Sequence, residues 1–80
     1  MAERILRLPD VKKLSGISRS SIYKFIAEGF FPKPIALGPR MVGWLESELA
    51  ALNAARVRGA SDDEIRELVQ RLEAARRNAA

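Results

Sequence analysis

Five side chains that can bind a polyanion are grouped between positions 19 and 24. They are two cations, two hydroxyls and a phenol: Arg19, Ser20, Ser21, Tyr23 and Lys24. An arginine fork can bond guanine O6 and N7, short serines allow close approach to a base edge or a phosphate, and lysine is a general phosphate contact. Tyr23 can pack on a sugar or donate to a phosphate. The group predicts nucleic-acid contacts; the alternatives are a solvated face and, for Tyr23, packing against a neighbouring element.

Three further cations occupy positions suited to the same partner. Lys12 and Lys13 precede the group by a few residues, from where they can reach backbone phosphates. Arg40 follows the turn-forming pair Gly38-Pro39. At the tip of a turn an arginine can enter a minor groove or contact a phosphate. For all three cations the alternative is an ordinary solvated charge.

The missing residue types exclude most catalytic chemistry. The 80 residues contain no cysteine and no histidine, so thiolate nucleophiles, disulfides, the commonest metal ligand and the commonest general base are lost. Glu46 and Glu48 are two positions apart, which places them on different faces of a helix and makes them a poor acid–base pair. A chain of this length has a small core with little room for a pocket. We therefore expect a binding module that is not an enzyme and has no cofactor or metal site.

Neither a membrane span nor an export signal is visible in the sequence. No apolar run approaches the roughly 20 residues that a membrane-spanning helix needs. The first four residues, Met1-Ala2-Glu3-Arg4, lack the layout of a signal peptide. With no cysteine to form disulfides, these features predict a cytoplasmic protein without a membrane partner.

Positive charge is concentrated in the first part of the chain. Lysine and arginine number 14 against 10 acidic residues, which gives a net charge of +4. Residues 1–59 hold ten of the bases and five of the acids, whereas residues 60–80 hold four and five. A basic segment followed by a near-neutral one favours a polyanionic partner, with nucleic acid as the first candidate.

Two short helices must position the group at 19–24. Pro9 and Gly16 predict the start and the end of a first helix over residues 9–15. Ser18 is a suitable N-cap for a second helix over residues 18–28. The apolar positions of the second helix share one face: Ile22, Phe25, Ile26 and Gly29. Two helices joined by so tight a turn form a helix-turn-helix.

A small hairpin and a third helix are expected to follow. Two prolines force an extended path through residues 32–34. Short apolar runs then flank Gly38-Pro39-Arg40, which predicts a β-hairpin with a positive φ at the glycine. The stretch Arg4–Leu8 is read as a short strand, and a third helix as beginning at Leu45 and stopping at Gly59. The few large aromatic side chains are expected in the core and not in base stacking: Phe25, Phe30, Phe31 and Trp44.

A fourth amphipathic helix is expected from about Asp62 to Arg77. Ser61 and Glu64 form a capping box at its start. Its apolar positions have the 3-4-3 spacing of a heptad seam: Ile65, Leu68, Leu72 and Ala75. The seam either folds back on the alanine-rich face of the third helix or contributes to self-association. We divide the chain accordingly into residues 1–59, the DNA-binding domain, and residues 60–80, this helix.

Four segments in order carry a family resemblance. They are Leu6-Arg7-Leu8-Pro9-Asp10-Val11, Gly16-Ile17-Ser18-Arg19-Ser20-Ser21-Ile22-Tyr23-Lys24, Phe31-Pro32-Lys33-Pro34-Ile35-Ala36-Leu37-Gly38 and Arg40-Met41-Val42-Gly43-Trp44-Leu45-Glu46-Ser47-Glu48. Residues 4–58 resemble the AlpA family of phage-type regulators, small members of the MerR-like winged-helix group. The fold class expected is therefore mainly α with a small β-hairpin, a MerR-like winged helix-turn-helix plus an extra C-terminal helix.

The resemblance implies sequence-specific binding of double-stranded DNA by a prophage transcription regulator. An excisionase-like recombination directionality factor, with an integrase as a second partner, is the alternative of the same class. A protein-interaction module that uses its fourth helix and does not bind DNA is the alternative of a different class. Retention on DNA at low salt separates this last reading from the first two.

Overall fold

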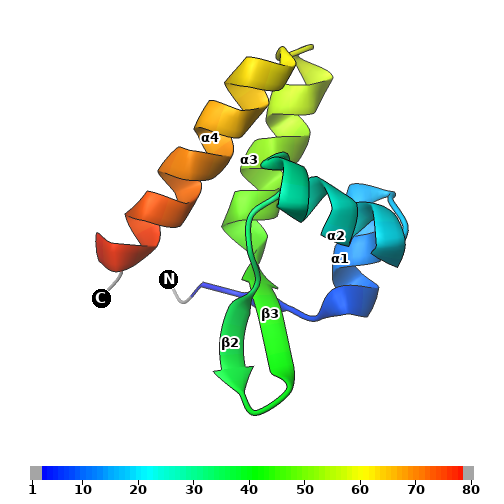
Figure 1. Ribbon diagram of the computed structural model, residues 1–80, viewed down its shortest axis with the longest axis vertical. Helices are drawn as coiled ribbons and strands as arrows, with labels where there is room; N and C mark the ends of the chain where they lie inside the picture. Colours follow the sequence, from blue (N-terminus) through cyan, green and yellow to red (C-terminus); the bar gives the residue numbers. More distant parts are fainter. Residues whose placement is uncertain (1–2, 79–80) are drawn as a thin grey trace.

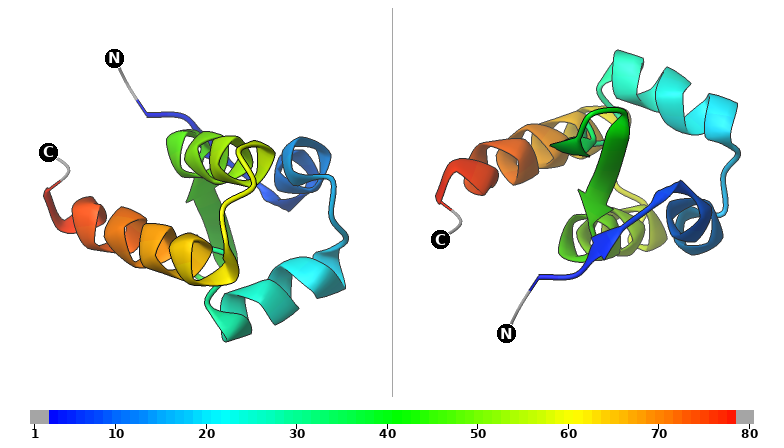
Figure 2. Two further views of the ribbon diagram at one scale, coloured as in Figure 1. Left: turned by 90° about the horizontal axis from the view of Figure 1, so that it is seen from above. Right: turned by 90° about the horizontal axis from the view of Figure 1, so that it is seen from below.

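The computed structural model describes residues 3–78, which fold into four α-helices and a three-stranded antiparallel sheet (Figure 1). In chain order the elements are β1 (Ile5–Leu6), α1 (Leu8–Ser15), α2 (Arg19–Glu28), β2 (Ile35–Gly38), β3 (Met41–Leu45), α3 (Glu46–Val57), α4 (Asp62–Ala75) and a 3-10 turn, η1 (Arg76–Asn78). Figure 2 shows α1 beside α3 on one side of the molecule, with α2 and α4 on the other. This mainly helical layout with one hairpin confirms the expected fold class.

The caps expected for the helix-turn-helix are present. Gly16 ends α1 with a φ of 74°, and Gly29 ends α2 with a φ of 84°. Both values lie in the left-handed region that glycine enters without a steric penalty. Ser18 is the N-cap of α2, and its hydroxyl accepts the Ser21 amide at 3.3 Å. Local chemistry therefore sets both ends of the helix that carries the group at 19–24.

The hairpin joins the edge strand β2 to the central strand β3, since the strand order of the sheet is β1-β3-β2. Gly38 pairs with Met41, so Pro39 and Arg40 form the tip. The positive φ was expected at Gly38 but is found at Arg40, where it is 60°. Pro39 takes the first central position, where its φ is fixed at a negative value, so the positive φ of this turn falls on the second central residue, Arg40, as in a type II turn.

The core joins the sheet to all four helices. Its largest fully buried side chains include Trp44, Phe31, Leu6 and Ile22. The indole N–H of Trp44 donates to the Pro32 carbonyl at 3.1 Å, so its one polar group is satisfied. Core packing of Trp44 and Phe31 is thus confirmed, whereas Phe25 and Phe30 are half-buried and meet edge to face at 6.2 Å.

The fourth helix folds back along α3, and both members of its capping box are bonded. Its buried side chains are Ile65 and Val69. Leu68 and Leu72 are half-buried, and Ala75, expected in the seam, is exposed. Leu45, expected to begin α3, is instead the last residue of β3 and the N-cap of α3. In the part of the chain that the structure describes, no helix is both long and apolar enough to span a bilayer.

Candidate nucleic-acid interface

The outward face of α2 carries most of the group identified in the sequence. Arg19, Ser20, Tyr23 and Lys24 are exposed, whereas Ser21 is half-buried. These positions follow the i, i+1, i+4, i+5 pattern of a single helix face. The opposite face is anchored by Ile22, which is completely buried. The helix therefore presents two cations and a hydroxyl to solvent from its first two turns.

Three hydroxyls cluster at the start of α2. Ser18 Oγ donates to Ser21 Oγ at 3.0 Å and lies 3.3 Å from Ser20 Oγ. Ser21 is therefore engaged in the N-cap network, while Ser20 remains exposed at the helix end. Small side chains here leave the first turn open to a large partner, and unpaired amides at a helix N-terminus attract anions.

The N-terminus of α2 differs electrostatically from those of the other helices between residues 3 and 78. Each of the others has an acid in its first turn: Asp10 in α1, Glu46 and Glu48 in α3, and Asp62, Asp63 and Glu64 in α4. The first turn of α2 has no acid. It begins instead with Arg19, so the positive end of the helix dipole is reinforced and not neutralised. A phosphate placed here would meet no acidic side chain from the first turn of α2.

Tyr23 connects the face of α2 to the hairpin. Its ring meets the Trp44 ring of β3 edge to face, with centroids 6.5 Å apart. The Arg19 guanidinium lies 5.9 Å from the centre of the Tyr23 ring. Tyr23 is also 41% exposed, so it packs against the hairpin and still reaches solvent. Packing, the alternative raised for Tyr23, is thus observed, and a DNA contact by its hydroxyl stays a prediction.

The hairpin tip presents a cation between two exposed apolar side chains. Arg40 is exposed, and Leu37 and Met41 beside it are 39% and 44% exposed. Such a tip combines a charge for phosphates with apolar surface that suits the walls of a minor groove. Lys12 and Lys13 are exposed in the last turn of α1.

Of the nine described cations outside α1, α2 and the hairpin tip, four are bonded within the protein: Arg4, Arg56, Arg66 and Arg76. The ion pairs between described residues join Arg4 to Glu46, Arg66 to Asp63 and Arg76 to Glu48. None of them involves a cation of the predicted site. The charges of α1, α2 and the tip are therefore available to an external anion.

Three arginines that sequence reasoning did not single out bind main-chain carbonyls. They are Arg56, Arg66 and Arg76. Burial lowers the pKa of Arg56, whereas the bond to the Glu48 carboxylate raises the pKa of Arg76. Both groups stay cationic at any physiological pH. No local sequence signal marks them, because their partners lie 26 to 43 positions away.

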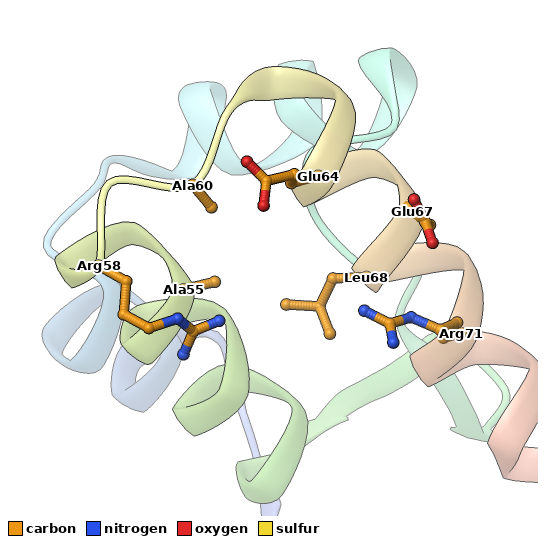
Figure 3. Close-up of a pocket in the computed structure, with 7 residues that line it drawn as sticks. All are labelled: Ala55, Arg58, Ala60, Glu64, Glu67, Leu68 and Arg71. Atoms are coloured by element: carbon orange, nitrogen blue, oxygen red, sulfur yellow. The ribbon is translucent and has the colours of Figure 1, made fainter.

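A groove of about 170 Å³ lies between α3 and α4 (Figure 3). Leu68 faces Ala55 across it, with two carboxylates and two arginines around them: Glu64, Glu67, Arg58 and Arg71. The Glu64 carboxylate accepts a hydrogen bond from the Ser61 amide, and this bond lowers the pKa of Glu64. The carboxyl is therefore ionised at neutral pH and unsuited to donating a proton. The groove offers no arrangement for catalysis.

Comparison with known proteins places residues 4–56 in a family model described as "Prophage CP4-57 regulatory protein (AlpA)". The "Uncharacterized protein ORF88" of Enterobacteria phage P4 is 49% identical over 57 residues, which are 71% of this chain and 65% of that protein. The "DNA-binding transcriptional activator AlpA" of Escherichia coli strain K12 is 41% identical over 54 residues, 60% of this chain and 77% of that protein. The chain thus spans just under two thirds of its phage P4 relative. No solved structure matches.

Proposed function

The chain belongs to the AlpA family of phage regulatory proteins, and from this premise we propose that it binds double-stranded DNA sequence-specifically and regulates transcription from a prophage or mobile element. The family match confirms the resemblance carried by the sequence motifs. The family model is described as a regulatory protein, and the Escherichia coli relative is DNA-binding by name. The E. coli relative is a transcriptional activator by name, which favours a role at a promoter.

One observation carries the proposal: α2 exposes cations that have no ion-pair partner among the described residues, at a helix end without acids. In this proposal α2 lies in the major groove. Arg19 reads a guanine, while Ser20 and Ser21 allow close approach to the base edges. Tyr23 contacts a sugar or phosphate, and Lys24 a phosphate.

The hairpin is the second contact in this proposal. Arg40 enters the adjacent minor groove or binds its phosphates, and Leu37 and Met41 rest on the groove walls. Lys12 and Lys13 touch the backbone from α1. The contacts of α2 provide sequence readout, while those of α1 and the tip mainly fix orientation and affinity.

The proposal is tested by titrating labelled duplexes at several salt concentrations. If three to five phosphates are neutralised, log K falls against log salt with a slope of about −3 to −4.5. Arg71→Ala is the matched control, because it removes an exposed cation from α4, outside the proposed interface. Its slope stays that of the starting protein. A slope near zero on every duplex would falsify the proposal. Genomic footprinting then identifies the natural sites.

The recombination alternative uses the same surface and adds an integrase as partner. Footprints beside an attachment site, together with a change in the direction of integrase-catalysed recombination, would favour it. Footprints at a promoter, with changed transcription and unchanged recombination, favour the regulator. The protein-interaction alternative predicts a partner complex without retention on DNA at low salt.

Residues 1–59 hold every proposed DNA contact, and residues 60–80, which include α4, hold none. The protein is proposed to act in the cytoplasm, where its DNA lies.

Self-association through α4 is a hypothesis, and it must use surface other than Ile65 and Val69, which are buried in the core of the single chain. Sedimentation of the free protein and titration of a two-site duplex test it, since independent binding by a monomer would argue against association.

A further inference from the structure

The connector between α2 and β2, residues 29–34, is held by side chains from distant parts of the chain. Arg56 of α3 donates from Nη2 to the Phe30 carbonyl at 3.1 Å. Trp44 of β3 donates from its indole N–H to the Pro32 carbonyl at 3.1 Å. The connector has no regular secondary structure that would bond these carbonyls internally, so each bond both satisfies an acceptor and fixes the path of the chain.

The C-terminal segment supplies the remaining bonds. Arg66 of α4 donates from Nε to the carbonyl of Glu28, the last residue of α2, at 3.2 Å. The Glu73 carboxylate accepts the Lys33 amide at 2.8 Å, and Arg76 Nη2 donates to the Lys33 carbonyl at 2.7 Å. One helix and its terminal turn therefore hold the connector at both ends: at its α2 end through Arg66, and at its β2 end through Glu73 and Arg76.

Two of these side chains are themselves held in place. The Arg76 guanidinium makes a forked ion pair with Glu48 of α3, with bonds of 2.9 and 2.7 Å. The Glu48 side chain is only 4% exposed, so this pair is shielded from solvent. The Arg66 guanidinium lies 4.2 Å from the centre of the Phe30 ring, within cation–π distance. The bonds to the connector thus start from fixed positions.

We propose that Arg66, Glu73 and Arg76, which we call the clamp, set the position of the hairpin relative to α2 and thereby let both reach DNA at once. The proposal rests on the proposed function, in which α2 and the hairpin tip are separate contacts. All three residues lie outside the family match over residues 4–56. In this chain the C-terminal helix is therefore a positioning element for the DNA-binding surface.

The physical reason is preorganisation. Once α2 is bound, contact by the hairpin is an intramolecular step, and its strength depends on how narrowly the connection confines the tip. A loose connector spreads the tip over many positions, and binding must then pay the entropy of fixing it. When the connector is clamped, the hairpin tip is already fixed in the free protein, so binding does not pay this entropy cost.

The first test measures geometry in the free protein. Because the chain has no native cysteine, the pair Lys24→Cys and Met41→Cys places spin labels on α2 and at the tip alone. The distance distribution is compared between the otherwise unaltered chain and the clamp variant Arg66→Ala/Glu73→Ala. This variant removes two of the three clamp side chains and keeps Arg76, because the buried Glu48–Arg76 pair supports the fold. We expect one narrow distance peak in the first protein and its loss in the second.

The control is Glu67→Ala/Arg71→Ala. It also removes one acid and one base from exposed positions of α4, but neither side chain bonds the connector. It keeps the narrow peak. If the clamp variant keeps the same peak as well, the inference is overturned, and this result does not depend on any DNA binding.

The second test measures the use of the clamp on DNA. In the starting protein and in the control, Arg40→Ala lowers affinity about fivefold at 0.15 M salt, the effect of one lost phosphate contact. In the clamp variant the same substitution lowers it less than about twofold, since the tip no longer adds avidity. An equal loss in all backgrounds overturns the role in binding. Absence of any salt-dependent DNA binding refutes the proposed function, while the label distances still decide the clamp.

Discussion

Replacing Arg40 with glycine should move stability and DNA affinity in opposite directions. Arg40 lies at the hairpin tip with a φ of 60°, a conformation that costs a residue with a Cβ about 1–2 kcal/mol. Glycine removes this penalty and also removes the charge. Arg40→Ala is the matched control, because it removes the same charge and keeps the Cβ.

The stability change follows from the backbone alone, since the exposed Arg40 side chain makes no hydrogen bond or ion pair among the described residues. Part of the gain is offset by the greater freedom of glycine in the unfolded chain, which costs about 0.5–1 kcal/mol. A net gain of about 0.5 kcal/mol raises Tm by about 2–4 °C in a domain of this size. Calorimetry of Arg40→Gly beside Arg40→Ala measures this difference directly.

Both substitutions should weaken DNA binding equally. Loss of one phosphate contact makes the slope of log K against log salt shallower by about 0.9, which is a factor of about five at 0.15 M salt. Fluorescence anisotropy on one duplex at four salt concentrations resolves this change. A Tm no higher for Arg40→Gly than for Arg40→Ala would refute the strain argument. Wild-type affinity in both variants would refute the contact.

Three further outcomes are expected. Arg19→Ala relaxes the preference at one base pair by about 1–3 kcal/mol, whereas Lys24→Ala weakens all duplexes about equally, as titration of single-base variants will show. Arg76→Met leaves the Glu48 carboxylate buried without a partner and lowers the free energy of unfolding by about 3–5 kcal/mol, whereas Glu48→Met/Arg76→Met costs much less; urea denaturation distinguishes them. The hydrogen bond from the Ser61 amide lowers the folded-state pKa of Glu64. The stabilisation that this bond gives is therefore present above the unfolded-state pKa of Glu64 and is lost as pH falls through the folded-state pKa. Glu64→Gln removes this contribution to the loss of stability in acid.

Local signals in the sequence predicted the helix-turn-helix within residues 1–59 well. Gly16, Ser18 and Gly29 act within one helical turn of their own position, so their roles can be read without knowing the fold. The same holds for the prolines that exclude a helix from the connector. The site residues on α2 were accessible to this reasoning because a face is defined by spacing within a single helix.

The seam predicted for α4 was partly wrong for a geometric reason. The 3-4-3 spacing assumes a repeat of 3.5 residues, which only a supercoiled helix keeps. At about 100° per residue in a straight helix, Val69 lies about 40° around the axis from Ile65, whereas Ala75 lies about 80° away. The structure accordingly buries Val69 and exposes Ala75. The side of α4 that packs against α3 depends on how the two helices fit together, so the sequence of neither helix alone predicts it.

The sequence does not show which arginines face solvent and which are bonded within the protein. Arg19 and Arg40 face solvent, while Arg56 and Arg76 are turned inward onto carbonyls of the connector. All four contribute equally to the net positive charge from which a polyanionic partner was predicted. What separates them is the need of the connector for donors, because two prolines and a helix end leave its carbonyls without regular partners. An arginine that satisfies such a carbonyl is part of the scaffold, and its charge is already engaged within the protein, whereas the charges of Arg19 and Arg40 remain free for the proposed contacts with DNA.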